Sequence, residues 1–282
     1  MRTTILLAAG AMFLSACGDQ NSVVADTTVD HPYDGPMYVE RGPDNPDAMK
    51  RAGAAGLALE CDAPVYNGGG GDYADSGLES VQDDAESAFE NWTDEEGIGA
   101  SMPGPDDGYV VERVEGDRVL LSYDVDGLTK VAVIAADGIR DWNDDVGWGV
   151  ESWGQCDPAE LPAAVTDELG LAVWQDPEGR RVPIGTLSSA DGPEHCDWQD
   201  IVFLHLRDDT FLRDTEGELR DFLRTTYSET AALPDNAKDT GFEHGGRRLW
   251  LAADGSAAYL VAAEDAGDVE RWPAASEPIG CA

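Results

Sequence analysis

Two apolar runs, each interrupted by an Asp-Gly pair, constrain the fold of this chain more than any other feature. The first spans residues 118–135 and turns at Gly127, and the second spans residues 248–262 and turns at Gly255. An Asp-Gly pair between β-forming stretches favours an antiparallel hairpin, because the tight turn needs residues that tolerate positive φ. Each half of the chain is therefore predicted to contain an antiparallel hairpin.

The two halves also share the order of their cysteines and tryptophans. Each half opens with a cysteine, and each hairpin is followed by a tryptophan and then a second cysteine. Two interpretations remain open, tandem duplication and coincidence, since Asp-Gly hairpins are common. We adopt duplication, in which each half closes its own disulfide, although four cysteines allow three connectivities. The predicted bridges are Cys61–Cys156 and Cys196–Cys281.

The rest of the pattern predicts few helices. Apolar residues three or four positions apart predict an amphipathic helix over residues 77–95, capped near Asp75 or Ser76. Short helices are expected at 160–168 and 216–226, strands at 108–115, 118–126, 129–136, 147–154 and 198–206, and a loop at 228–240. The predicted fold class is α+β, with two tandem, duplicated antiparallel-sheet units, few helices and one disulfide in each unit.

Composition divides the chain into four segments. The second of them is polar and rich in proline, which is typical of a flexible tether. The predicted segments are a signal peptide at 1–16, a tether at 17–50, a first α+β unit at 51–160 and a second β-rich unit at 161–282.

The first seventeen residues have the pattern of an export signal. Arg2 precedes an apolar run over residues 5–14, which is too short to span a bilayer as a helix. The run ends in Leu-Ser-Ala-Cys at Cys17, which resembles the lipobox of bacterial lipoproteins. That resemblance implies acylation of Cys17 and a lipid anchor at the extracytoplasmic face of the cell membrane. A plain signal peptide with an incidental cysteine is the alternative.

The charge of the chain limits its partners. It carries 57 acidic and 18 basic residues, with a formal net charge of −39. Such a surface repels nucleic acid and anionic headgroups, so we expect no nucleic-acid partner and membrane attachment through lipid alone. The acidity is interpreted either as solubility and adaptation to salt or as a face for a cationic partner.

An acidic loop is the one candidate for a metal site. Asp141, Asn143 and Asp145 place oxygen atoms at alternate positions, which suits calcium. The loop matches an EF-hand only in part, because Gly147 falls at position seven instead of six and Glu151 at eleven instead of twelve. A solvated turn is the alternative, and no other cofactor is expected.

Tryptophans supply the candidate binding residues. Trp142 and Trp148 lie on the acidic loop, where exposed rings beside carboxylates would suit a sugar or a cationic partner; burial in the core is the alternative. The four histidines are scattered without H-x-x-x-H spacing, and no G-x-S-x-G occurs, so catalytic residues remain unknown.

Two stretches, residues 147–158 and 194–200, resemble uncharacterised lipoproteins of high-GC Gram-positive bacteria. That family implies a location and no activity. The expected function is therefore that of a lipid-anchored, non-catalytic extracytoplasmic protein that contacts a cell-envelope component. A secreted enzyme with an unrecognised site and a calcium-binding surface protein are the alternatives.

Overall fold

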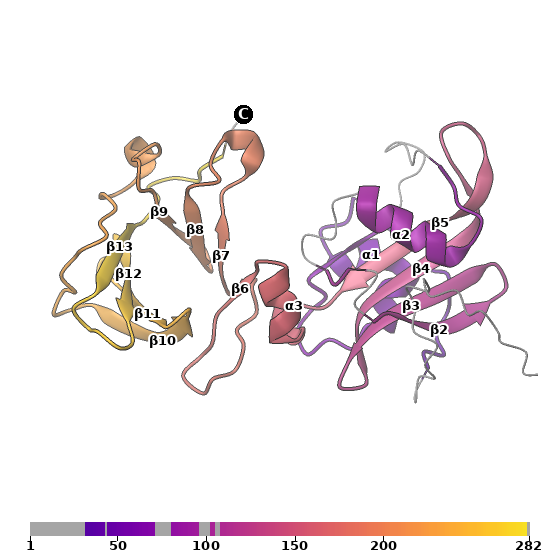
Figure 1. Ribbon diagram of the computed structural model, residues 1–282, viewed down its shortest axis with the longest axis horizontal. Helices are drawn as coiled ribbons and strands as arrows, with labels where there is room; N and C mark the ends of the chain where they lie inside the picture. Colours follow the sequence, from indigo (N-terminus) through magenta and orange to yellow (C-terminus); the bar gives the residue numbers. More distant parts are fainter. Residues whose placement is uncertain (1–31, 43, 71–79, 96–101, 105–107, 281–282) are drawn as a thin grey trace, which may run out of the picture.

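The computed structural model describes residues 32–42, 44–70, 80–95, 102–104 and 108–280. Across these residues the chain is mostly antiparallel sheet with three α-helices, which agrees with an α+β class. It forms three sheets in the described part, where one sheet in each half was expected (Figure 1). Among the described helices, none combines the length and the apolar character needed to cross a membrane.

The first half is built on one antiparallel sheet with a helix against each face (Figure 1). In spatial order its strands are β1 (Asn67–Gly69), β5 (Val146–Gln155), β4 (Leu128–Arg140), β3 (Arg118–Val125) and β2 (Val110–Glu115). Because successive side chains of a strand point to opposite faces, Leu120 packs toward α1 (Ala48–Ala58) and Leu121 toward α2 (Ala85–Glu95).

Small residues bring α1 close to the sheet. A methyl group placed on Gly68 of β1 would lie 2.6 Å from Cβ of Ala52, which no real contact allows. The helix begins after Asp47, whose Oδ1 accepts the N–H of Met49 at 3.1 Å. Alanine and glycine on the buried side of α1 therefore set the short distance between helix and sheet.

The amphipathic helix of the first half begins later than predicted. It starts at Ala85 instead of residue 77, and its cap is Asp84, whose Oδ1 accepts the N–H of Ser87 at 2.8 Å. The preceding residues are extended because Gln82 exchanges two backbone hydrogen bonds with Trp148 of β5, at 3.0 and 2.9 Å. The predicted caps, Asp75 and Ser76, lie outside the described residues.

The second half contains two antiparallel sheets that enclose a common core. The first consists of β6 (Ala172–Val173), β7 (Leu187–Asp191), β8 (Val202–Leu206) and β9 (Asp209–Arg213), and the second of β10 (Lys238–His244), β11 (Arg247–Leu251), β12 (Ala257–Ala262) and β13 (Val269–Pro273). Apolar residues of both sheets meet between them, as in a sandwich. Backbone bridges Gln175–Glu243 and Phe211–Ala274 join the sheets along both pairs of edges.

In the second half one predicted element is wrong and two differ in their bounds. The expected helix at 216–226 is only a 3₁₀ turn, Arg220–Phe222, because Asp214 accepts three backbone N–H groups and fixes the preceding loop. The expected loop at 228–240 ends in β10, and the strand expected at 198–206 begins only at Val202. The short helix near 160–168 is present as a 3₁₀ turn, Pro158–Glu160, followed by α3 (Ala163–Glu168).

Both Asp-Gly hairpins form, but with different turns. In β3–β4, Asp126 and Gly127 take φ values of 54° and 79°, as a two-residue turn requires. In β11–β12 only Gly255 has positive φ, and its N–H donates to the carbonyl of Ala252 at 3.0 Å. The likeness between the halves thus extends to these hairpins, whereas the surrounding sheets differ.

The disulfide predicted for the first half is confirmed. Cys61 and Cys156 are bonded, with Cα atoms 5.2 Å apart. Cys196, which forms part of the 3₁₀ turn Glu194–Cys196, is also disulfide-bonded. Cys281, its predicted partner, lies outside the described residues, so that pairing stays a prediction.

Candidate functional site

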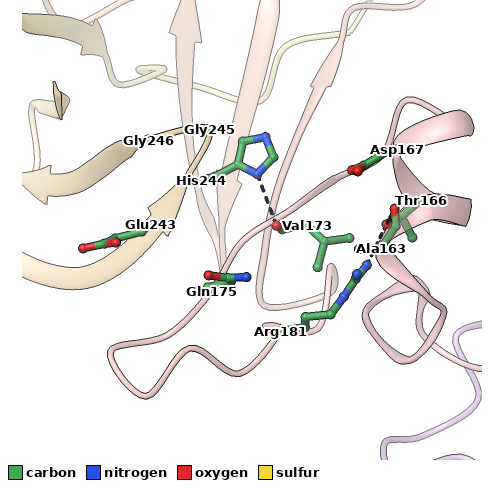
Figure 2. A pocket seen from close by; sticks show the side chains of 10 residues that line it. All are labelled: Ala163, Thr166, Asp167, Val173, Gln175, Arg181, Glu243, His244, Gly245 and Gly246. Carbon is green, nitrogen blue, oxygen red and sulfur yellow. Dashed lines mark hydrogen bonds between the residues drawn. The ribbon is translucent and has the colours of Figure 1, made fainter. Parts of the chain in front are cut away.

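A cavity of about 400 Å³ lies where α3 meets β6 and the turn between β10 and β11 (Figure 2). We call it the Arg181 pocket. Its polar lining consists of Thr166, Asp167, Gln175, Arg181, Glu243 and His244. The backbone pairing of Gln175 with Glu243, at 2.8 and 2.9 Å, holds the two sides of the cavity together. Segments far apart in the sequence therefore build one site.

Arg181 is the most unusual group in this lining. Its Nη2 donates to Thr166 Oγ1 at 2.7 Å and lies 3.4 Å from the Pro158 carbonyl, whereas its buried Nε has no hydrogen-bond partner. Within the described part of the chain, no carboxylate lies within ion-pair distance of it. Burial lowers the pKa of the Arg181 guanidinium, and the nearby charge of Asp167 opposes that shift. The site thus holds a partly desolvated positive charge without a counter-ion.

His244 lines the pocket, and one of its ring nitrogens is engaged by the backbone. Its Nδ1 lies 3.2 Å from the Val173 carbonyl, and because a carbonyl only accepts, Nδ1 carries the hydrogen (Figure 2). The neutral ring therefore keeps Nε2 as an acceptor. Trp174 supports the ring, with centroids 5.5 Å apart.

Two carboxylates complete the pocket. Asp167 is exposed on α3, and Glu243 is held by Arg248, whose Nε lies 2.8 Å from Oε1. Figure 2 shows Glu243 at the left of the view and Asp167 at the right, on the same side as Arg181, with His244 between the two carboxylates. Positive and negative groups thus surround a single small cavity.

The hydroxyl in the pocket is already engaged. Thr166 Oγ1 accepts from Arg181 and donates its hydrogen to the Ala163 carbonyl at 3.1 Å, so the hydroxyl hydrogen is directed at a backbone group and not at a base that would activate it. The geometry accordingly suits recognition of a charged ligand through hydrogen bonds and ion pairs.

Sequence reasoning missed this pocket. Arg181 and His244 do not belong to any sequence motif with a characteristic spacing. They line the same cavity because the edge of β10 pairs with Gln175. The first residues of β10, 238–240, were expected to belong to a loop. The local sequence offers only an apolar stretch, residues 171–174, followed by Asp176-Pro177, and this pattern indicates a strand and a turn but no site.

In the acidic loop, the Asp141 side chain accepts hydrogen bonds from the backbone of the loop itself. Asp141 is buried, and its Oδ1 accepts the N–H groups of Asn143 and Asp145 at 2.8 and 3.0 Å. Among the residues that the structure describes, no group of three or more His, Cys, Asp or Glu side chains is arranged to hold a metal ion. The carboxylate of Asp141 is therefore used for a turn of the Asx type.

The two candidate tryptophans lie in different environments. The Trp142 side chain is 65% exposed, as a binding residue would be, whereas Trp148 is partly buried and packs against the core of the first half. His205 is exposed on β8. Its ring stacks on Phe203 with centroids 6.2 Å apart, and partial burial lowers its pKa.

A second, more apolar hollow of about 370 Å³ lies beside His205 and Phe203 and reaches Trp198 and Cys196. It contains no unpaired buried charge of the kind seen at Arg181, so the Arg181 pocket is the stronger candidate. Cys17, the predicted lipidation site, lies outside the described residues. Comparison of the chain with family models, curated proteins and solved structures finds no match.

Proposed function

We propose that the protein is a lipid-anchored, extracytoplasmic binding protein that holds a small charged molecule in the Arg181 pocket. The observation that carries this proposal is the Arg181 guanidinium, which is partly desolvated and lacks a counter-ion in the described structure. The proposed anchor rests on the resemblance of the sequence at Cys17 to a lipobox. The remaining cysteines Cys196 and Cys281 are proposed to close the second half.

Energetics favour a ligand at this position. A charged group removed from water costs several kcal/mol unless it gains a partner. A guanidinium offers parallel N–H donors that match a carboxylate or phosphate. A bound anion would replace the hydration that the guanidinium loses on burial. Within a chain rich in carboxylates, Arg181 has none at ion-pair distance among the described residues, so an external anion would supply a direct partner.

The supporting chemistry is that of binding, since the Thr166 hydroxyl is engaged on both sides. A thermal-shift screen of small carboxylates, phosphates and amino acids against the full-length protein tests the proposal. A ligand at 100 times its Kd stabilises by about 2.7 kcal/mol, which raises Tm by roughly 5–10 °C in a chain of this size.

Arg181→Gln should abolish the stabilisation by that ligand. Arg180→Gln is the matched control, because Arg180 is the exposed neighbour, pairs with Asp176 at 2.7 Å and does not line the pocket. A screen in which no compound stabilises the protein, or in which Arg181→Gln responds like the wild type, would contradict the proposed function.

A further inference from the structure

We infer, building on the proposed binding function, that the Arg181 pocket takes a zwitterion: a free amino acid or short peptide. Its carboxylate would pair with Arg181, and its ammonium group would lie toward Asp167. Both charged residues line the same cavity of about 400 Å³. The proposal thus specifies two charges of opposite sign on one small ligand.

The balance of charge in the lining excludes simpler ligands. A plain anion would gain at Arg181 but would lie beside two carboxylates, in a protein of net charge −39. A plain cation would satisfy the carboxylates but would leave Arg181 without a partner. A ligand that carries both signs improves the interactions of both Arg181 and the carboxylates, because opposite charges attract and like charges repel.

The two carboxylates are not equivalent. Glu243 is already paired with Arg248, whereas the Asp167 carboxylate has no hydrogen bond or ion pair within the described part of the chain. Asp167 lies close enough to Arg181 for its negative charge to raise the pKa of Arg181, which opposes the lowering by burial. We therefore assign the larger part of the ammonium recognition to Asp167.

Neutral groups in the lining fit the same ligand. The free Nε2 of His244 accepts a hydrogen bond, as an ammonium N–H requires, and the Gln175 side chain offers both a donor and an acceptor. The volume lies at the low end of small-molecule sites, which span roughly 300–1,000 Å³. This size suits an amino acid or dipeptide and is too small for a polymer chain.

Calorimetry with L-alanyl-L-alanine and with the twenty free amino acids tests the inference on the full-length protein. For the tightest binder, the N-acetylated analogue removes the positive charge and the C-terminal amide removes the negative charge. We expect each analogue to bind at least tenfold more weakly than the parent. Equal affinity for either analogue would overturn the inference.

Variants assign each charge to its residue. Asp167→Asn should weaken the parent compound at least fivefold while leaving the N-acetylated analogue unchanged, and Glu168→Gln on the same helix is the matched control. Arg181→Lys should weaken the parent and leave the amide unchanged. Asp167 is exposed, so its substitution keeps the test valid even if a change at Arg181 disturbs folding.

The outcomes separate this inference from the proposed function. If none of the zwitterions binds but another compound stabilises the protein in an Arg181-dependent manner, the ligand class is wrong and the binding function stands. If no compound binds through Arg181, both are wrong.

Discussion

We expect the Glu160→Gln substitution to lower the free energy of unfolding of the first half strongly, although the two side chains are almost equal in size. Glu160 Oε2 lies 2.7 Å from Nζ of Lys130, and the two side chains are only 9% and 4% exposed. The same carboxylate accepts the N–H groups of Asp62 and Ala63 at 2.9 and 3.1 Å. It therefore ties strand β4 to the segment that follows Cys61.

The expected cost follows from the buried ammonium group. Without Glu160, the nearest carboxylate to Lys130 is that of Asp62, 3.9 Å away on a side chain that is 88% exposed. Loss of one partner of a buried ion pair costs about 3–5 kcal/mol. At roughly 2–4 °C per kcal/mol, Tm should fall by about 6–20 °C.

The double variant Lys130→Met/Glu160→Gln distinguishes an unpaired charge from lost packing. The double variant leaves no unpaired charge in the interior, so it should recover most of the loss. Lys50→Met is a control, because Lys50 and Asp47 form an exposed pair at 3.8 Å, worth about 0–1 kcal/mol.

Urea denaturation followed by tryptophan fluorescence measures these effects, since Trp92 and Trp153 are buried in the core of the first half. Titration of free thiols should show that the Cys61–Cys156 bridge stays closed in every variant. A loss below 1 kcal/mol for Glu160→Gln, or a double variant no more stable than the single one, would refute the reasoning.

Three further outcomes are expected. Cys17→Ser should move the protein from the membrane fraction to the medium in cell fractionation; unchanged anchoring would end the lipoprotein proposal. Burial raises the pKa of Glu112, and a hydrogen bond from the Tyr33 N–H opposes that shift. The folded protein therefore loses stability as the pH rises through the raised pKa and Glu112 ionises. Glu112→Gln should therefore be stabilising at pH 7, with a gain that disappears on acidification in pH-dependent melting; a constant gain would point to another cause. Asp214→Ala should cost about 1–3 kcal/mol in urea denaturation, because three backbone N–H groups lose their acceptor. A smaller loss there would mean that water replaces the carboxylate.

Local chemistry explains why the hairpins were predictable. The turn at Gly127 is encoded by an Asp-Gly pair and by the alternation of the strands beside it, all within about twenty residues. The pairing of Cys61 with Cys156 was also accessible, because the likeness of the two halves selected one connectivity among three.

Tertiary contacts explain what was not predictable. The start of α2 is set by Gln82, whose backbone pairs with Trp148 of β5 and so keeps the preceding residues extended. The second sheet of the second half depends on β10, which has no apolar alternation strong enough to predict a strand. The Arg181 pocket depends in turn on β10, so a site assembled through that edge could not be found before the pairing was known.

The acidity of the chain is explained in part by its turns. Several aspartates accept backbone N–H groups at helix starts and loops, among them Asp47, Asp84, Asp141, Asp157, Asp176 and Asp214.

Such carboxylates stabilise the fold in their ionised form. Hydrogen bonds from Ser256 lower the pKa of Asp254, so its contribution is present at neutral pH and is lost as pH falls through that lowered value. An aspartate that is satisfied in this way needs no cation, and acidic density alone therefore does not identify a cation site. The more informative signal is a charge that the fold leaves without an ion-pair partner and with an unsatisfied donor, which is the position of Arg181 among the described residues.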